Sequence, residues 1–369
     1  MQTEPGLKQK IHACRLQSKF SGDCTMPSSK KFRTAVQEAA AVLHRGGLVA
    51  FPTETVYGLG ADAENPAAVA RIFAAKGRPA DHPLIVHMAR NDPLGRWARD
   101  IPPTAFRLAQ RYWPGPLTVI LRRADRVPDM VTGGQDTVGL RVPDHPLALA
   151  LLEVFGGGIA APSANRFGQV SPTTAAHVRE ELGDAVDLLL NGGPCRVGIE
   201  STILDLSGQQ PRLLRPGAIT IAELEAVLEQ PVASPGNNAP RAPGMLRSHY
   251  APNTPLYLVT AVNLEAEICQ RIRQRQRVAV LAMSATLLPE SCPRHPMPPH
   301  PTGWARELYA QLRALDKQEL DAILIEKPPT GADWQAVSDR LGRAASAHRA
   351  PGEDASAVSD AISFDLSVP

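Results

Sequence analysis

Short apolar runs alternate with amphipathic stretches over most of the chain. Such runs are typical of strands buried in a sheet, whereas apolar residues that recur every three or four positions predict helices. The predicted strands of the first part are Leu48–Phe51, Leu84–Met88, Leu117–Leu121, Val138–Val142, Ile159–Pro162, Asp187–Leu190, Ser201–Leu206 and Arg212–Leu214. The predicted helices are Lys31–Arg45, Pro66–Lys76, Pro103–Tyr112, Pro146–Phe155 and Thr173–Leu182, with Thr173 as a candidate cap. Because some strands follow one another directly and others are separated by a helix, we expect an α/β domain with a mixed sheet.

A proline-rich segment at residues 231–255 shows no period and divides this pattern from a second one. A structureless stretch of that length is uncommon in a compact protein unless it has a function or is disordered. Beyond it, strands are predicted at Leu256–Val259, Val278–Met283 and Ala322–Glu326, and helices at Leu264–Gln276, Gly303–Leu315 and Asp333–Ala345. We therefore expect a first domain at 28–229, a linker at 230–254 and a smaller α/β domain at 255–369.

The first 27 residues are polar and without period, so we expect a disordered N-terminal extension. Ser28 and Ser29 are favourable helix N-caps. Folded structure is therefore expected to begin near Ser28, and Met26 is a candidate for the natural start.

Composition and charge exclude several classes of protein. The 369 residues include 39 basic and 37 acidic side chains, and a net charge of +2 is too small for a protein that coats nucleic acid. No apolar run approaches the roughly 18 residues of a membrane-spanning helix. The five cysteines are scattered, without the spacing of a zinc site. An unpaired set of this kind favours the reducing cytoplasm.

Lys76-Gly77-Arg78-Pro79 follows a predicted helix and places two cations beside a glycine, where the backbone can approach a ligand closely. A guanidinium fork and an ammonium group suit a polyphosphate. The same cations are also favourable at a helix C-terminus without any ligand. These residues alone leave both interpretations open.

Arg141 lies inside an apolar predicted strand, and Arg215 directly follows another. A charge in such a position needs a partner, which is either a protein carboxylate or a bound anion. Ser163 and Ser171 follow a third strand, at the kind of strand end where α/β sheets bind ligands. Serines there also form turns and caps, so this pattern is not decisive.

Of two common nucleotide-binding signatures, one lies in the wrong context and the other is absent from the sequence. Gly58–Ala63 has the spacing of a dinucleotide-binding loop, but the next helix would begin only after Asn65, outside the glycines. The sequence contains no GxxxxGK(S/T) phosphate loop. His82 and His87 are five residues apart and would point to opposite faces of a strand, so we predict no metal pair.

The order of the motifs is more specific than any one of them. PTETVYGLG, KGRPADHPLIVH, WPGPLT, GLRVPDHP, APSANRFGQVSPT, IESTILDL and LRPG follow one another between residues 31 and 228. In this order they resemble the YrdC-like domain of threonylcarbamoyl-AMP synthases. Ser248-His249-Tyr250-Ala251-Pro252 and the second domain resemble the long, two-domain form of that family. The resemblance implies a twisted mixed sheet with helices, followed by a smaller Rossmann-like domain.

The resemblance also implies a reaction. L-threonine takes up bicarbonate or CO2 as a carbamate, the carbamate attacks the α-phosphorus of ATP, and pyrophosphate leaves. A separate tRNA-threonylcarbamoyl transferase complex then places the product on the adenosine beside the anticodon. Mg2+ is expected with the ATP phosphates, without a dedicated metal site in the protein.

By similarity, the residues that bind L-threonine are Thr55, His87, Arg141, Ala161 and Ser201. Those that bind ATP are Lys76, Arg78, His82, Thr137, Ser163, Ser171, Arg215 and Tyr250, of which Lys76 and Arg78 are also assigned to catalysis. Tyr250 would reach over the nucleotide from the linker. A lid of this kind would keep water from the labile carbamate and acyl-adenylate.

Two other functions stay open from the sequence. A YrdC-like domain that binds RNA without catalysis would use clustered cations such as Arg122, Arg123 and Arg126, and its binding would depend steeply on salt. A carbamoyl-adenylating enzyme that uses carbamoyl phosphate contains a similar domain. Such enzymes also carry acylphosphatase and zinc-finger segments, which this sequence does not show.

Overall fold

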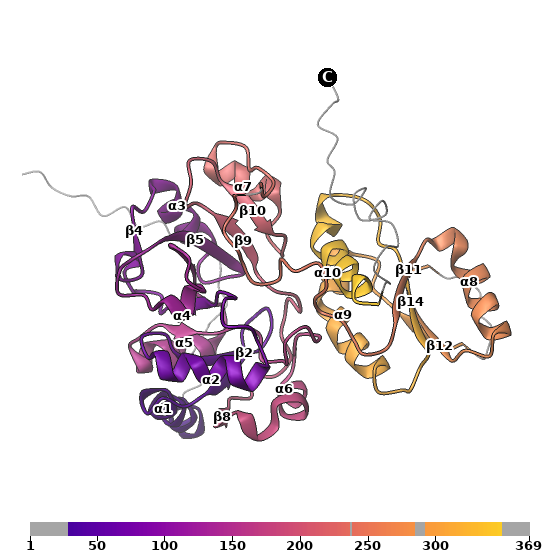
Figure 1. The fold of residues 1–369 in the computed structure, drawn as a ribbon, viewed down its shortest axis with the longest axis horizontal. Helices are drawn as coiled ribbons and strands as arrows, with labels where there is room; N and C mark the ends of the chain where they lie inside the picture. Colours follow the sequence, from indigo (N-terminus) through magenta and orange to yellow (C-terminus); the bar gives the residue numbers. More distant parts are fainter. Residues whose placement is uncertain (1–28, 237, 285–291, 349–369) are drawn as a thin grey trace, which may run out of the picture.

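The computed structural model describes residues 29–236, 238–284 and 292–348, which form two α/β domains joined by an extended segment (Figure 1). The extension expected at residues 1–27 lies outside the described residues, as does the chain beyond residue 348. Within the described ranges, no helix is long and apolar enough to span a membrane.

The first domain contains a mixed sheet with the strand order β10-β9-β5-β6-β3-β7-β2-β1-β8, and β4 pairs with β5 at its side. The pairs β5–β9, β3–β6 and β1–β8 are parallel, whereas the others are antiparallel. This arrangement confirms the predicted mixed sheet. The strands are β1 (Val49–Phe51), β2 (Gly58–Asp62), β3 (Ile85–His87), β4 (Ala98–Arg99), β5 (Leu117–Arg123), β6 (Thr137–Arg141), β7 (Ile159–Ala160), β8 (Leu188–Leu189), β9 (Thr202–Asp205) and β10 (Arg212–Arg215).

Helices of the first domain begin and end at the signals visible in the sequence. The Asn65 side chain caps the second helix by accepting from two backbone N–H groups, and Gly77 ends it in the left-handed conformation, with φ 60°. The helices are α1 (Lys30–His44), α2 (Pro66–Lys76), α3 (Pro103–Tyr112), α4 (Asp129–Thr132), α5 (Pro146–Phe155), α6 (Ala175–Leu182) and α7 (Ile221–Leu228). Short 3-10 turns lie at Leu94–Arg96 and Gly183–Ala185.

The two faces of this sheet are covered differently. Alternation along the first strand sends Leu48 and Ala50 to the face packed by α2, α3, α6 and α7, and Val49 and Phe51 to the face packed by α1 and α5. Farther along this second face, isoleucines of β3, β5 and β9 pack against Ala242 of the linker. The second face is thus covered by helices at one end and by the linker at the other.

The second domain has an all-parallel sheet in the order β11-β14-β12-β13. Its strands are β11 (Leu256–Val259), β12 (Val278–Ala282), β13 (Arg294–Pro296) and β14 (Ala322–Glu326). Its helices are α8 (Ala261–Arg273), α9 (Pro301–Leu315) and α10 (Gln335–Ser346), with a 3-10 turn at Ala332–Trp334. Parallel strands with intervening helices confirm the smaller Rossmann-like domain.

Apolar packing and ion pairs join the two domains. Val56, Val170 and Ile199 of the first domain belong to the same buried cluster as Trp304 and Leu308 of the second. Beside this apolar contact, Arg313 of α9 pairs with Glu181 of α6, and Lys317, just beyond the end of α9, pairs with Glu180 of α6.

Local features around strand β2 and helix α6 add to the sequence-based picture. Gly58 and Gly60 lie within strand β2, which agrees with the expectation that they form no dinucleotide loop. A side chain on Gly60 would come within 2.6 Å of Ile159 and 2.8 Å of Phe51, which explains the glycine by close packing. Thr174, not Thr173, caps α6 by accepting from the His177 N–H. The strands β2, β4 and β13 and the helices α4 and α7 were not predicted.

Candidate active site

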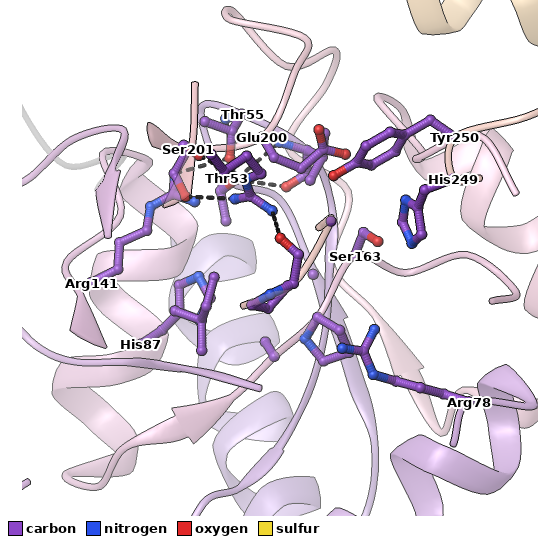
Figure 2. A pocket seen from close by; sticks show the side chains of 18 residues that line it. Thr53, Thr55, Arg78, His87, Arg141, Ser163, Glu200, Ser201, His249 and Tyr250 are labelled. Atoms are coloured by element: carbon purple, nitrogen blue, oxygen red, sulfur yellow. Dashed lines mark hydrogen bonds between the residues drawn. The ribbon is translucent and has the colours of Figure 1, made fainter. Parts of the chain in front are cut away.

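A pocket opens on the second face of the first sheet, between the end covered by helices and the end covered by the linker. Figure 2 shows Arg141 and His87 on one side of it, and His249 and Tyr250 on the other. The pocket is lined by Thr53, Thr55, Val56, Gly58, Arg78, Ile85, His87, Arg141, Ala161, Pro162, Ser163, Glu200, Ser201, Arg215, Pro243, Gly244, His249 and Tyr250.

The strand register brings two of the predicted threonine-binding residues together. β3 and β6 are parallel neighbours, and their final residues, His87 and Arg141, are direct partners in the register. Both side chains therefore leave the sheet at the same edge and on the same face. This contact joins two segments that are far apart in the sequence.

Arg141 is buried and has both a carboxylate partner and neutral partners. Its Nη2 lies 2.7 Å from Glu54 Oε1 and donates to Thr55 Oγ1 at 2.9 Å, while Nε donates to the Gly115 carbonyl at 3.2 Å. The other Glu54 oxygen accepts from the Asp144 N–H at 3.0 Å. The third nitrogen, Nη1, makes no hydrogen bond with the described residues. Arg141 is thus anchored on one side and retains donors for a ligand.

His87 lines the pocket as an uncharged side chain. Burial, followed by the nearby Arg141 charge, lowers the pKa of its imidazole to about 3. Its Nδ1 is buried and has no hydrogen-bond partner among the described residues. The ring can therefore accept or donate one hydrogen bond to a bound molecule without contributing a charge at neutral pH.

Arg78 and Lys76 leave the end of α2 in different directions. Arg78 lines the pocket, donates to the Pro83 carbonyl at 2.9 Å and lies 5.6 Å from the centre of the Phe167 ring. Burial lowers the pKa of its guanidinium to about 10, which keeps it protonated at neutral pH. Lys76 is buried behind the segment Ser163–Asn165, called here the Ser163 turn. Its Nζ donates to the carbonyls of Ser163, at 2.6 Å, and Asn165. Burial, followed by the Arg78 charge, lowers the pKa of Lys76 well below its ordinary value.

Arg215 and Ser201 form the part of the wall between β9 and β10. Arg215 Nε and Nη2 donate to the carbonyl and hydroxyl oxygens of Ser201, each at 3.0 Å, and Nη1 donates to the Pro243 carbonyl at 3.0 Å. Ser201 Oγ also lies 2.8 Å from Thr118 Oγ1. None of these partners is a carboxylate, so the charge of Arg215 is not neutralised by them.

The linker closes the pocket with two aromatic side chains. The rings of His249 and Tyr250 meet edge to face, with centroids 4.1 Å apart, and Tyr250 stacks on Tyr309 at 5.9 Å. The Tyr250 hydroxyl is buried without a hydrogen-bond partner among the described residues. Burial, followed by the charge of Glu200, raises the pKa of this hydroxyl, so it stays protonated and available as a donor.

The structure brings most of the predicted site residues together. Nine of the thirteen line the pocket: Thr55, Arg78, His87, Arg141, Ala161, Ser163, Ser201, Arg215 and Tyr250. The remaining four do not line it. Lys76 lies behind the turn, His82 packs edge to face on Phe167 at 5.1 Å, Ser171 donates to Glu200 at 2.5 Å, and Thr137 is at the far end of β6.

Sequence reasoning did not assign Glu200, His249 and the turn at Pro243–Gly244, which also line the pocket. Signals for two of them were present. Glu200 directly precedes Ser201, and His249 directly precedes Tyr250 in the linker motif. The turn carries no such signal, because only the path of the linker brings it to the pocket.

Comparison with known proteins gives consistent matches to both domains. Residues 41–217 match the family described as "Telomere recombination", and residues 219–346 match "Threonylcarbamoyl-AMP synthase, C-terminal domain". A threonylcarbamoyl-AMP synthase of Pyrococcus abyssi is 40% identical over 320 residues, which cover 84% of this chain and 93% of the relative. A threonylcarbamoyl-AMP synthase of Bacillus subtilis is 41% identical over 324 residues, covering 84% and 92%. The crystal structure of P. abyssi Sua5 complexed with L-threonine matches with a TM-score of 0.79 at 40% identity, over 85% of this chain and 94% of that one.

Proposed function

The chain belongs to the family of threonylcarbamoyl-AMP synthases, and we propose that its pocket makes threonylcarbamoyl-AMP and pyrophosphate from L-threonine, bicarbonate or CO2, and ATP. The observation that carries this proposal is the convergence of Arg78, Arg141 and Arg215 on one pocket. Of the three, only Arg141 has an ion pair with a carboxylate among the described residues. Such a surplus of buried positive charge suits substrates that carry a carboxylate and a polyphosphate.

The Arg141 end of the pocket is proposed to bind L-threonine. The free Nη1 of Arg141 is available to the threonine carboxylate, with Ser201 as a second donor. Thr55, the neutral His87 and the Ala161 backbone surround the place left for the rest of the amino acid. The uncharged imidazole matters because a cation there would repel the threonine ammonium group before it loses its proton.

The opposite end is proposed to bind ATP. Arg78, Ser163 and Arg215 also line the pocket and would meet the phosphates, with the Tyr250 hydroxyl as a further donor; Arg215 adjoins the threonine end through its hydrogen bonds to Ser201. We assign Lys76 to positioning of the Ser163 turn, because its ammonium group is held by two backbone carbonyls.

The three other predicted ATP residues are supported unequally. Ser171 would act through its hydrogen bond to Glu200. His82 would act through Phe167, on which Arg78 also lies. Among the described residues, no contact of Thr137 supports a place in the site.

The proposed chemistry depends on positioning and charge neutralisation. The threonine nitrogen forms a bond to CO2 and loses a proton, which gives a carbamate anion. A carbamate oxygen then forms a bond to the α-phosphorus, and the bond from that phosphorus to the bridging oxygen breaks as pyrophosphate leaves. Arg78 and Arg215 would stabilise the charge that develops on the phosphates, in a pocket that the linker shields from water.

Mg2+ is part of the proposal as the counter-ion of ATP. The described residues contain no group of three metal-ligating side chains. The carboxylates nearest the pocket, Glu54 and Glu200, are already paired with arginines. We therefore propose that phosphate oxygens and water hold the ion.

We place the enzyme in the cytoplasm, where its product would pass to a tRNA-threonylcarbamoyl transferase complex. The free thiols of Cys195, Cys269 and Cys292 are consistent with a reducing compartment. Weak RNA binding by the first domain would help this transfer and is part of the same proposal.

Pyrophosphate release tests the function directly. Purified full-length protein is incubated with ATP, Mg2+, L-threonine and bicarbonate, and each component is omitted in turn. Release that requires both L-threonine and bicarbonate is expected. In a parallel reaction, carbamoyl phosphate replaces L-threonine and bicarbonate, and release only there would favour the carbamoyl-adenylating alternative. No release by folded protein, together with salt-sensitive binding of tRNA, would favour RNA binding without catalysis.

A further inference from the structure

Arg340, on helix α10 of the second domain, contacts Glu200, which lines the pocket in the first domain. We propose that Arg340 is a positioning residue: it neutralises Glu200 and thereby leaves the Arg215 guanidinium free for the ATP phosphates. This inference rests on the proposed function, because it takes Arg215 as a phosphate-binding residue. It assigns the second domain a part in binding ATP.

Arg340 bonds to Glu200 and to Pro216, the residue that follows Arg215 in the chain. Its Nε donates to Glu200 Oε2 at 2.8 Å, and its Nη2 donates to the Pro216 carbonyl at 3.0 Å. Its Nη1 pairs with Asp339 at 2.6 Å on its own helix. The side chain is fully buried, at 0% exposure. Since Arg340 and Glu200 are both buried, the hydrogen bonds hold the guanidinium in a fixed position relative to the residues that line the pocket.

Glu200 is a buried carboxylate that lines the pocket. Burial alone would raise its pKa, but the charges of Arg340 and Arg215, with hydrogen bonds from Ser171 and Arg340, lower the pKa to about 2. Tyr309 of the second domain adds a hydrogen bond to Oε2 at 2.9 Å. Glu200 is therefore ionised at neutral pH. Without a cation beside it, that charge would repel the phosphates of ATP.

The hydrogen-bond partners of Arg215 agree with this role of Arg340. All three of its hydrogen bonds go to neutral oxygens of Ser201 and Pro243. It forms no ion pair within the described residues, although Glu200 adjoins Ser201 in the chain and lines the same pocket. Because Arg340 pairs with Glu200 from behind, Arg215 keeps its charge for a ligand. If Arg340 were removed, we expect Arg215 to pair with Glu200 and to lose affinity for phosphate.

A charge-removal cycle tests this role in the full-length protein. KM and kcat for ATP and KM for L-threonine are measured by pyrophosphate release for wild type, Arg340→Met, Glu200→Gln and the double variant. Arg340→Met is expected to raise KM for ATP about tenfold or more, with a smaller change for L-threonine. The double variant is expected to recover most of that loss, because no unpaired carboxylate remains.

A merely structural role for Arg340 gives a different result. If the residue only holds the domains together or supports Tyr250, whose ring centre lies 5.1 Å from its guanidinium, the double variant will be at least as impaired as Arg340→Met. That outcome overturns the inference. Arg313→Met is the matched control, since it also breaks an ion pair between the domains, with Glu181, but outside the pocket lining. Its KM for ATP should stay near that of wild type.

Thermal unfolding of each variant is measured first. If Arg340→Met does not fold, Arg340→Lys replaces it; this variant keeps a positive charge beside Glu200, so KM for ATP should rise less than about tenfold, and a rise of about tenfold or more would contradict the inference. Failure of the proposed function is distinguishable, because wild-type protein itself would then release no pyrophosphate in response to L-threonine and bicarbonate.

Discussion

At the scale of single residues, the three arginines of the pocket differ in what accompanies their charge. Arg141 forms an ion pair with the Glu54 carboxylate. Arg78 and Arg215 instead donate to neutral oxygens, one of them for Arg78 and three for Arg215. The positive charge is thus most fully compensated at the end that we assign to the amino acid. It is least compensated at the end assigned to the triphosphate, which carries more negative charge.

Arg141→Met should affect both binding and stability. Loss of the guanidinium removes charge-assisted hydrogen bonds to the threonine carboxylate, and KM for L-threonine should rise about 10- to 100-fold. The change also leaves the buried Glu54 carboxylate without its partner, which should cost about 3–5 kcal/mol of the free energy of unfolding. Kinetics and urea unfolding measure the two effects.

The control for this variant is Arg122→Met, on the adjacent strand β5. Arg122 is exposed and pairs with Asp136 at the surface, where such pairs contribute little to stability. Both KM for L-threonine and the free energy of unfolding should stay near wild type. An unchanged KM in Arg141→Met would remove this residue from the threonine site.

His87 should make stability depend on pH. Its pKa is about 3 in the folded protein, and the unfolded chain has the ordinary value of about 6.5. As the pH falls below that ordinary value, only the unfolded chain takes up a proton. The stability from this group is therefore present at neutral pH and is lost as the pH falls toward 3, by up to about 1.4 kcal/mol per pH unit.

His87→Gln should accordingly reduce the slope of the free energy of unfolding against pH. Between about pH 6 and pH 5 the reduction should approach about 1.4 kcal/mol per pH unit, which corresponds to one proton. Urea titrations at several pH values measure the slope, above the range where carboxylates take up protons. Equal slopes for the variant and the wild type would show that His87 is protonated equally in both states.

At the scale of elements, the linker owes its shape to two backbone positions with positive φ. Tyr250 has φ 62° and Gly244 has φ 86°. A side chain on Gly244 would meet the Tyr250 hydroxyl at 2.1 Å. The close approach of these two residues lets the linker cross the pocket while the Tyr250 ring packs on Tyr309. The described residues of the linker thus form a wall of the site even though they contain no helix or strand between α7 and β11.

Gly244→Ala should therefore displace Tyr250 and reduce turnover at least about tenfold, because the new methyl group competes with the hydroxyl for the same space and requires a strained φ. Gly236→Ala is the matched control in the same linker, since a methyl group there meets none of the described residues within 4 Å. It should keep wild-type kinetics. Equal activity of the two variants would show that the approach of Gly244 to Tyr250 is not needed for turnover.

At the scale of the whole molecule, the two domains share interior contacts. One apolar cluster contains residues of the first domain, of the linker and of the second domain. Glu200 accepts hydrogen bonds from Tyr309 and Arg340 across the same contact. Apolar and ionic contacts that are both buried make separate movement of the domains costly. We therefore expect them to unfold together.

The four tryptophans allow a test of this cooperativity. Trp97 and Trp113 lie in the first domain, and Trp304 and Trp334 lie in the second. One variant replaces the first pair with phenylalanine and another replaces the second pair. In each, urea unfolding followed by tryptophan fluorescence should coincide with unfolding followed by circular dichroism. Separate midpoints within one variant would show that the domains unfold independently.

The sequence by itself predicted most of the elements, and the resemblance of its motifs named half of the residues that line the pocket. Apolar periodicity and end signals such as Asn65 and Gly77 act locally, so they are visible without a structure. Strand β2 was missed because Gly58 and Gly60 lower strand propensity, and the glycine at position 60 is explained only by its packing against Phe51 and Ile159. The order of the motifs, through the resemblance it carries, named nine residues that line the pocket.

Only the tertiary structure decided which charges face each other. His87 and Arg141 are neighbours through strand register, and Arg141 and Glu54 pair between segments far apart in the chain. Lys76 was expected in the pocket and instead holds the turn behind it, since α2 ends with its ammonium group facing two carbonyls. The contact of Arg340 with Glu200 joins residues 140 positions apart. Such contacts depend on how domains pack, and no local pattern encodes them.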